Sequence, residues 1–120
     1  MNTTQQGAQG EEQAAQYLSQ KGHRILARNF RATGGEIDIV TLQKNTLVFV
    51  EVKERASHAF GGPIAAVTPT KQKRIVHAAL QFIKIHKKLT YNTVRFDVIC
   101  ILPAEIEHIE NAFVPPRMTL

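Results

Sequence analysis

The segment 46–54, which reads Thr-Leu-Val-Phe-Val-Glu-Val-Lys-Glu, constrains the fold of this chain more than any other feature. β-Branched and aromatic residues dominate it, as in a strand buried inside a sheet. A second segment with strand character, 36–42, precedes it, and Lys44-Asn45 forms a turn between the two. A two-residue turn there predicts an antiparallel hairpin in which Asp38 lies opposite Glu51.

The remaining segments predict one α/β domain with a mixed sheet flanked by helices. Helical spacing of apolar residues predicts two helices, and β-propensity predicts three more strands. In order, the predicted elements are a helix over 10–20, strands over 23–30, 36–42 and 46–54, a helix over 69–86 that Thr68 caps, and strands over 93–102 and 106–112. The helical crossover makes the third and fourth strands parallel, whereas the first three form an antiparallel meander.

The length of 120 residues suits a single domain over 1–120. We expect a loose N-terminus over 1–6, a connecting loop that contains Gly61-Gly62-Pro63, and an irregular tail over 114–120.

The chain is basic, with a formal net charge of +5 and a pI of about 9.7. Such a domain favours an anionic partner, and nucleic acid is the commonest one. A membrane surface is the rival partner, but the sequence has neither a long apolar run nor a lipidation motif. The first residues lack the pattern of a secretory signal, so we expect a cytoplasmic protein.

The strand over 93–102 carries residues for which structural roles are expected. Cys100 is the one cysteine, which excludes a disulfide framework and a thiolate zinc site. It lies among apolar residues, which predicts a buried thiol. Arg95 and Asp97 lie on the same face of the strand, and we expect them to form a structural ion pair.

The hairpin brings together groups that can bind a divalent cation. Carboxylates on neighbouring strands repel one another unless a cation lies between them. Asp38 and Glu51 therefore predict a site for Mg²⁺ or Mn²⁺, to which the carbonyl of Val52 can add a ligand. Lys53 lies on the same strand face as Glu51, where its ammonium group can position a water molecule or hold a phosphate.

The alternative interpretation is a solvent-exposed hairpin with cross-strand ion pairs. Against it, Leu47 and Phe49 occupy the same strand face as the charged residues, so this face is partly apolar. Glu11 also lies on the apolar stripe of its helix with Ala14 and Leu18, and an inward glutamate suits completion of a metal site. Its plainer role is that of a first-turn acid that interacts with the helix dipole.

Basic residues at the start of the second helix predict contacts with a nucleic-acid backbone. Lys71 and Gln72 are expected on the core-facing side of the helix, near the edge of the site. A solvated helix face is the alternative interpretation. The candidate nucleic-acid-binding residues are Arg55, Lys71, Gln72, Lys73 and Arg74.

Four short motifs, which together span nearly the whole chain, contain the candidate catalytic and metal-binding residues. They are Gly10-Glu11-x-x-Ala14-x-x-Tyr17-Leu18, Gly35-Glu36-Ile37-Asp38, Val48-Phe49-Val50-Glu51-Val52-Lys53 and Arg95-Phe96-Asp97-Val98. Together they resemble the YraN family of small bacterial proteins that are predicted to be endonucleases. This family is similar to the archaeal Holliday-junction resolvases of the PD-(D/E)xK restriction-endonuclease-like superfamily.

The resemblance implies a role for each matching residue. Asp38 matches the acidic residue of the superfamily motif, Glu51 and Lys53 match its (D/E)xK part, and Glu11 matches the helix-borne glutamate of the resolvase-like branch. Ile37 stands where the superfamily motif has proline. The implied function is a Mg²⁺- or Mn²⁺-dependent DNA endonuclease, with branched DNA as a candidate substrate and a homodimer as a candidate assembly.

Two other functions remain open from the sequence. One is a non-catalytic nucleic-acid-binding module with a nuclease-like fold. The other is a protein–protein adaptor whose basic surface meets an acidic partner.

Overall fold

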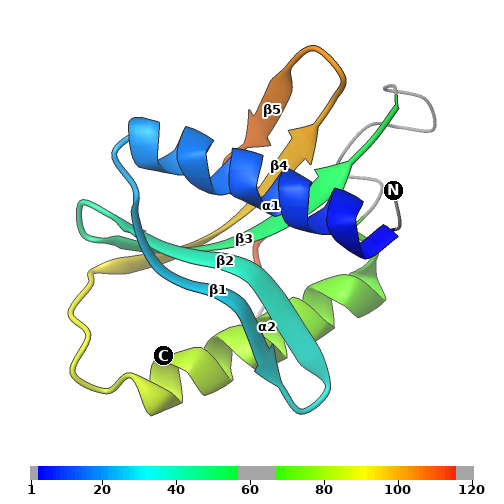
Figure 1. Ribbon diagram of the computed structural model, residues 1–120. Helices are drawn as coiled ribbons and strands as arrows, with labels where there is room; N and C mark the ends of the chain where they lie inside the picture. Colours follow the sequence, from blue (N-terminus) through cyan, green and yellow to red (C-terminus); the bar gives the residue numbers. More distant parts are fainter. Residues whose placement is uncertain (1–2, 57–66, 116–120) are drawn as a thin grey trace.

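A computed structural model describes residues 3–56 and 67–115 (Figure 1). One mixed five-stranded sheet, in the order β1-β2-β3-β4-β5, lies between two helices. The elements are α1 (Thr3–Gln20), β1 (Arg24–Ala32), β2 (Gly35–Gln43), β3 (Thr46–Glu54), α2 (Pro69–Ile85), β4 (Thr93–Ile101) and β5 (Ile106–Ile109). This confirms the predicted α/β fold and the order of its elements. Neither helix is long and apolar enough to span a membrane in the part of the chain that the structure describes.

Strand β3 is buried on both faces because each helix covers one side of the sheet. Val48 and Val50 pack in the cluster that contains α1, whereas Leu47 and Phe49 pack in the cluster that contains α2. All four side chains are at most 1% exposed. The alternation of β3 therefore fills two cores at once, and a slip by one residue would exchange them.

The predicted register of β2 on β3 is confirmed from Ile39–Val50 to Gln43–Thr46, but the paired residues end there and do not include the predicted pair of Asp38 with Glu51. Ile39 pairs with Val50 and Gln43 with Thr46, which is the register that the Lys44-Asn45 turn requires. Lys44 has a φ of 54°, a left-handed conformation that suits this tight turn. The pairing of β3 with β4 is parallel over the length of both strands.

The first helix begins earlier than predicted, at Thr3 instead of Gly10. The prediction followed the apolar stripe of Ala14 and Leu18. Three glutamines, at positions 5, 6 and 9, precede Gly10, and glutamine favours a helical backbone. The segment 1–6 was expected to be loose, and residues 3–6 of it belong to this helix. The Gly61-Gly62-Pro63 loop lies outside the described residues.

Strand β2 departs from strict alternation at Asp38. Strict alternation would place Ile37 and Ile39 on one face, but Ile37 packs with the α2-side cluster and Ile39 with the α1-side cluster. The β1–β2 hairpin curves along α2 (Figure 1), where Phe30 meets Phe82 edge to face at 5.2 Å between ring centroids. Packing on this helix therefore overrides the two-residue period of the strand.

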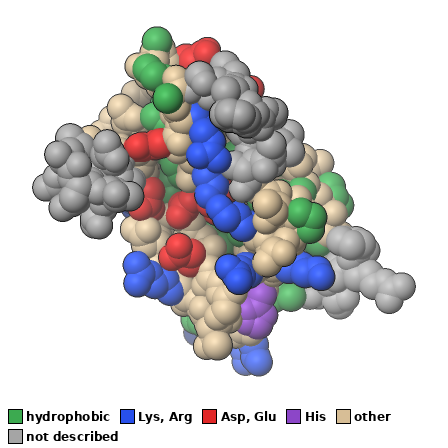
Figure 2. Space-filling model, turned by 90° about the vertical axis from the view of Figure 1, so that its right-hand side faces the viewer, with side chains coloured by type: hydrophobic (Ala, Val, Ile, Leu, Met, Phe, Trp, Pro, Cys, Tyr) green, Lys and Arg blue, Asp and Glu red, His purple; other side chains and the backbone are tan. Residues whose placement is uncertain are grey.

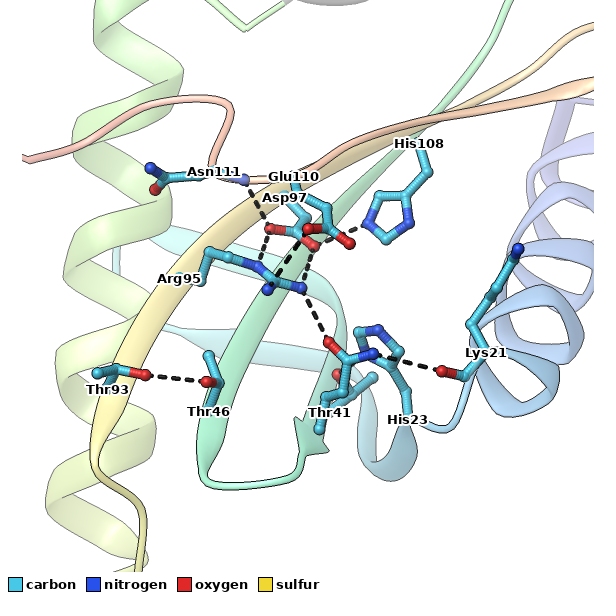
Figure 3. Close-up of polar contacts among 11 residues, drawn as sticks. Lys21, His23, Thr41, Thr46, Thr93, Arg95, Asp97, His108, Glu110 and Asn111 are labelled. Atoms are coloured by element: carbon cyan, nitrogen blue, oxygen red, sulfur yellow. Dashed lines mark hydrogen bonds and ion pairs between the residues drawn. The ribbon is translucent and has the colours of Figure 1, made fainter.

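A polar network around buried Asp97 links β4 to β5 and the residues that follow it (Figure 3). The Asp97 carboxylate accepts hydrogen bonds from Arg95 Nε at 2.8 Å, His108 Nε2 at 2.7 Å and the Asn111 backbone N–H at 3.0 Å. Burial alone would raise the pKa of Asp97, but these three donors outweigh it and hold the pKa below its ordinary value. The predicted ion pair between Arg95 and Asp97 is confirmed.

The variant Asp97→Ala should lower the free energy of unfolding by about 3–5 kcal/mol, because it leaves buried Arg95 and His108 without their acceptor. Urea denaturation at neutral pH measures the loss. Glu110→Ala is the matched control: its carboxylate lies 3.7 Å from Arg95 but its side chain is 58% exposed, so the loss should stay below about 1 kcal/mol. Equal losses in both variants would contradict a special role for Asp97.

Candidate functional site

A cleft of about 560 Å³ opens between the tip of the β1–β2 hairpin and the first turns of α2. On the side where α1 begins and β3 ends, Figure 2 shows acidic and basic side chains gathered next to one another. The charged side chains that line the cleft are Arg31 and Glu36 from the hairpin, Glu51 and Lys53 from β3, and Lys71 and Arg74 from α2. Two of the residues predicted for catalysis, Glu51 and Lys53, thus lie in a basic cleft.

Asp38 is held beside this cleft by the backbone of β3. The paired residues of β2 and β3 end at Ile39 and Val50. Asp38 lies just beyond the last pair, and its Oδ2 accepts a hydrogen bond from the Val52 backbone N–H at 2.7 Å. Burial, together with the nearby charge of Glu51, raises the pKa of Asp38 to about 7, although the Val52 hydrogen bond opposes the rise. Asp38 and Glu51 therefore form a carboxylate pair whose repulsion is not fully compensated.

Lys53 supplies a positive charge to this pair. Its Nζ lies 3.2 Å from Glu51 Oε1, and both side chains are less than one fifth exposed. Burial works to lower the pKa of Lys53, but a hydrogen bond with Lys71 and the charges of Glu51 and Asp38 raise it above its ordinary value. The pKa of Lys71 is lowered, first by that hydrogen bond and then by burial and by the charge of Lys53. Of the two amines, Lys53 therefore holds its proton more strongly.

Glu11 reaches toward the same carboxylates from α1. With its amide nitrogen turned toward this carboxylate, Asn29 donates to both oxygens of Glu11, at 2.9 and 3.0 Å. Burial raises the pKa of Glu11, Arg28 and Asn29 oppose that rise, and the charges of Glu36 and Glu51 add to it. Asn29 has a φ of 53°, which asparagine tolerates better than most residues. The carboxylate of Glu11 thus interacts electrostatically with Glu36 and Glu51, while Asn29 of β1 fixes its position.

The residues present fit a divalent cation, although they do not form a complete set of ligands. Among the described residues, no three aspartate, glutamate, histidine or cysteine side chains converge as a metal site. Asp38, Glu51 and the carbonyl of Val52 are what Mg²⁺ requires when water and a substrate phosphate complete its shell. Burial and the charge of Glu51, which raise the pKa of Asp38, both disfavour its ionised form, and a bound cation would offset that cost.

The predicted nucleic-acid-binding residues do not all lie together. Lys71 and Arg74 line the cleft. Gln72 and Lys73 instead line an apolar groove on another side of α2, where Gln72 Nε2 donates to the Val67 carbonyl at 3.1 Å. The expectation that Gln72 faces the edge of the site is therefore wrong.

Arg55 lies beyond the end of β3, outside the cleft. Its backbone N–H donates to the Ile101 carbonyl at 3.0 Å, and it lines a separate hollow with Gln9 and Gln13 of α1. Its charge still contributes to lowering the pKa of Lys71, so it belongs to the same electrostatic surroundings.

Sequence reasoning missed three residues of this region: Asn29, Arg31 and Glu36. The role of Asn29 could not be predicted, because the neighbouring residues do not indicate a left-handed backbone conformation within a strand. Glu36 was placed opposite Lys53 by the predicted register but was given no role. Arg31 lines the cleft because the hairpin curves toward α2. This curvature cannot be predicted from the periodicity of a strand.

Asp38→Asn should remove a pH dependence of stability. A carboxyl whose folded-state pKa is raised contributes stability at low pH, and this is lost as the pH rises through about 7. Without metal, the wild type should therefore lose on the order of 2 kcal/mol of unfolding free energy between about pH 5 and about pH 8. The variant, which can still accept from Val52, should not show this loss. Urea denaturation in a chelator measures both proteins, and identical pH profiles would contradict the assigned pKa.

The sequence also matches known proteins. The model of the family described as "Uncharacterised protein family UPF0102" matches residues 10–101. A UPF0102 protein of Saccharophagus degradans is 49% identical over 107 residues, which cover 89% of this chain and 91% of that protein. A UPF0102 protein of Thermodesulfovibrio yellowstonii is also 49% identical over 107 residues, covering 89% of this chain and 94% of that protein. The matched region runs from the helix that carries Glu11 to the end of β4, and the chain belongs to the UPF0102 family.

Proposed function

We propose that this protein is a Mg²⁺- or Mn²⁺-dependent endonuclease that hydrolyses phosphodiester bonds in DNA. The observation that carries the proposal is the grouping of Asp38, Glu51 and Lys53. Two adjacent, partly buried carboxylates share their surroundings with an ammonium group 3.2 Å from one of them, beside a basic cleft. Groups with strongly perturbed pKa values in a cleft are typical of functional sites.

Each of these groups has a task in phosphodiester hydrolysis. Asp38, Glu51 and the Val52 carbonyl would hold the divalent ion, which when bound supplies an activated water and neutralises charge on the phosphate. Lys53, charged at neutral pH, would donate to the attacking water or to a phosphate oxygen in the transition state. Glu11, held by Asn29, would complete the acidic wall of the site.

The resemblance of the motifs to the YraN family and to PD-(D/E)xK nucleases supports the same chemistry. It further suggests branched DNA as the substrate and a homodimer as the assembly. The net charge of +5 suits a DNA partner. We expect the protein to act in the cytoplasm.

A cleavage panel tests the proposal. Purified protein with Mn²⁺ should cut at least one of three labelled DNAs: a linear duplex, a flap or a four-way junction. Asp38→Ala should abolish cutting, because one of the two metal-binding carboxylates is lost. Lys53→Ala should slow cutting by about 10²–10³-fold while metal binding persists, as when a transition-state donor is removed.

Lys44→Ala is the matched control, since it removes an exposed lysine at the turn between β2 and β3 and should cut like the wild type. Cutting by Asp38→Ala at the wild-type rate would mean a contaminating nuclease and would refute the assignment.

A non-catalytic nucleic-acid-binding module is the second candidate function. The observation that favours it is that no three metal-binding side chains converge among the described residues. Calorimetry with Mn²⁺ separates the two functions. Binding tighter than about millimolar that Asp38→Ala removes would support the nuclease, whereas no binding with retained DNA affinity would support the module.

A further inference from the structure

We propose that Arg31 and Arg74 form a phosphate clamp that leads one DNA strand through the cleft, between the β1–β2 hairpin and α2. The inference rests on the proposed function for its ligand, since the phosphate held here neighbours the one to be cut. It adds a site that the motif residues do not include. Arg31 belongs to none of them, and Arg74 is placed opposite it only by the tertiary structure.

Arg31 is free to take a ligand. Its side chain is 81% exposed, and its ion pair with Glu36 is loose, at 3.7 Å between Nε and Oε2. Two other arginines are held by close ion pairs: Arg28 lies 2.8 Å from Glu12, and Arg95 is bonded twice to Asp97. A guanidinium group that is exposed and weakly paired can exchange its partner for a phosphate at little cost.

The charge of the cleft suits a phosphodiester backbone. Its lining contains four basic side chains, Arg31, Lys53, Lys71 and Arg74, against the two carboxylates of Glu36 and Glu51. The excess is positive before any cation is counted. The volume of about 560 Å³ falls in the range of pockets for ligands of nucleotide size, well short of a whole duplex. The cleft therefore suits a short stretch of one strand.

The two walls of the clamp are held against each other. Gly35, at the start of β2, lies so close to the backbone of Arg74 that a Cβ atom there would overlap the Arg74 carbonyl oxygen. Phe30 packs on Phe82 behind this contact. The hairpin that carries Arg31 and the helix that carries Arg74 are thus docked directly, which limits the reorganisation needed to grip a phosphate.

The floor of the clamp is the proposed reaction site. Glu51 and Lys53 line the same cleft, with Asp38 next to Glu51. A strand that lies between Arg31 and Arg74 therefore places a phosphate beside the carboxylates. This arrangement assigns positioning to the arginines and chemistry to the residues of the floor.

Fluorescence anisotropy with a labelled four-way junction and a labelled duplex, without divalent metal, tests the clamp. Arg31→Ala and Arg74→Ala should each weaken binding by about tenfold and reduce the slope of log Kd against log salt by about one. Arg24→Ala is the matched control, because Arg24 is an exposed arginine at the other end of the same strand. It should bind like the wild type.

Thermal unfolding verifies that the exposed substitutions leave the fold intact. Affinities and salt slopes of Arg31→Ala and Arg74→Ala equal to those of Arg24→Ala would refute the clamp, whatever the protein cleaves. Arg31-dependent binding without any cleavage by the wild type would refute the nuclease and retain the clamp. The two proposals can therefore fail separately.

Discussion

The burial of β3 on both faces is the constraint on which the rest of the structure depends. Val48 and Val50 face α1, Leu47 and Phe49 face α2, and none of the four can move without opening a core. Beyond Val50, where Glu51 and Lys53 follow, the side chains of the strand are no longer fully buried. Glu51 and Lys53 therefore continue a strand whose preceding residues are packed on both faces, and a reaction site requires such a scaffold.

Two aspartates on the strands that flank β3, Asp97 on β4 and Asp38 on β2, respond to burial in opposite ways. Asp97 accepts from Arg95, His108 and the Asn111 N–H, and its pKa is lowered despite burial. Asp38 accepts from the Val52 N–H, lies beside Glu51, and has a pKa raised to about 7. The first network is electrostatically complete and stabilises the fold. Around Asp38 the Val52 N–H does not offset burial and the charge of Glu51, which is costly for the protein alone and useful to one that binds a cation.

The β1–β2 hairpin links the fold to the candidate site. Its curvature along α2 interrupts the alternation of β2 at Asp38 and brings Arg31 into the cleft with Arg74. The same contact, between Gly35 and the backbone of Arg74, leaves room for no larger residue at position 35. Packing of this hairpin on α2 thus determines where Asp38 and Arg31 lie relative to the β3 residues of the floor.

The order of the elements, the register of β2 on β3 and the neighbourhood of Asp38, Glu51 and Lys53 could be predicted from the sequence. Strand alternation and turn length are local properties, and each allows few solutions. Three features could not be predicted from the sequence. Ile37 packs on the opposite face of β2 from Ile39, Gln72 lies away from the cleft that Lys71 lines, and Asn29 approaches Glu11. Each depends on how a curved hairpin or a helix packs against a distant part of the chain, and local periodicity carries no information about that contact.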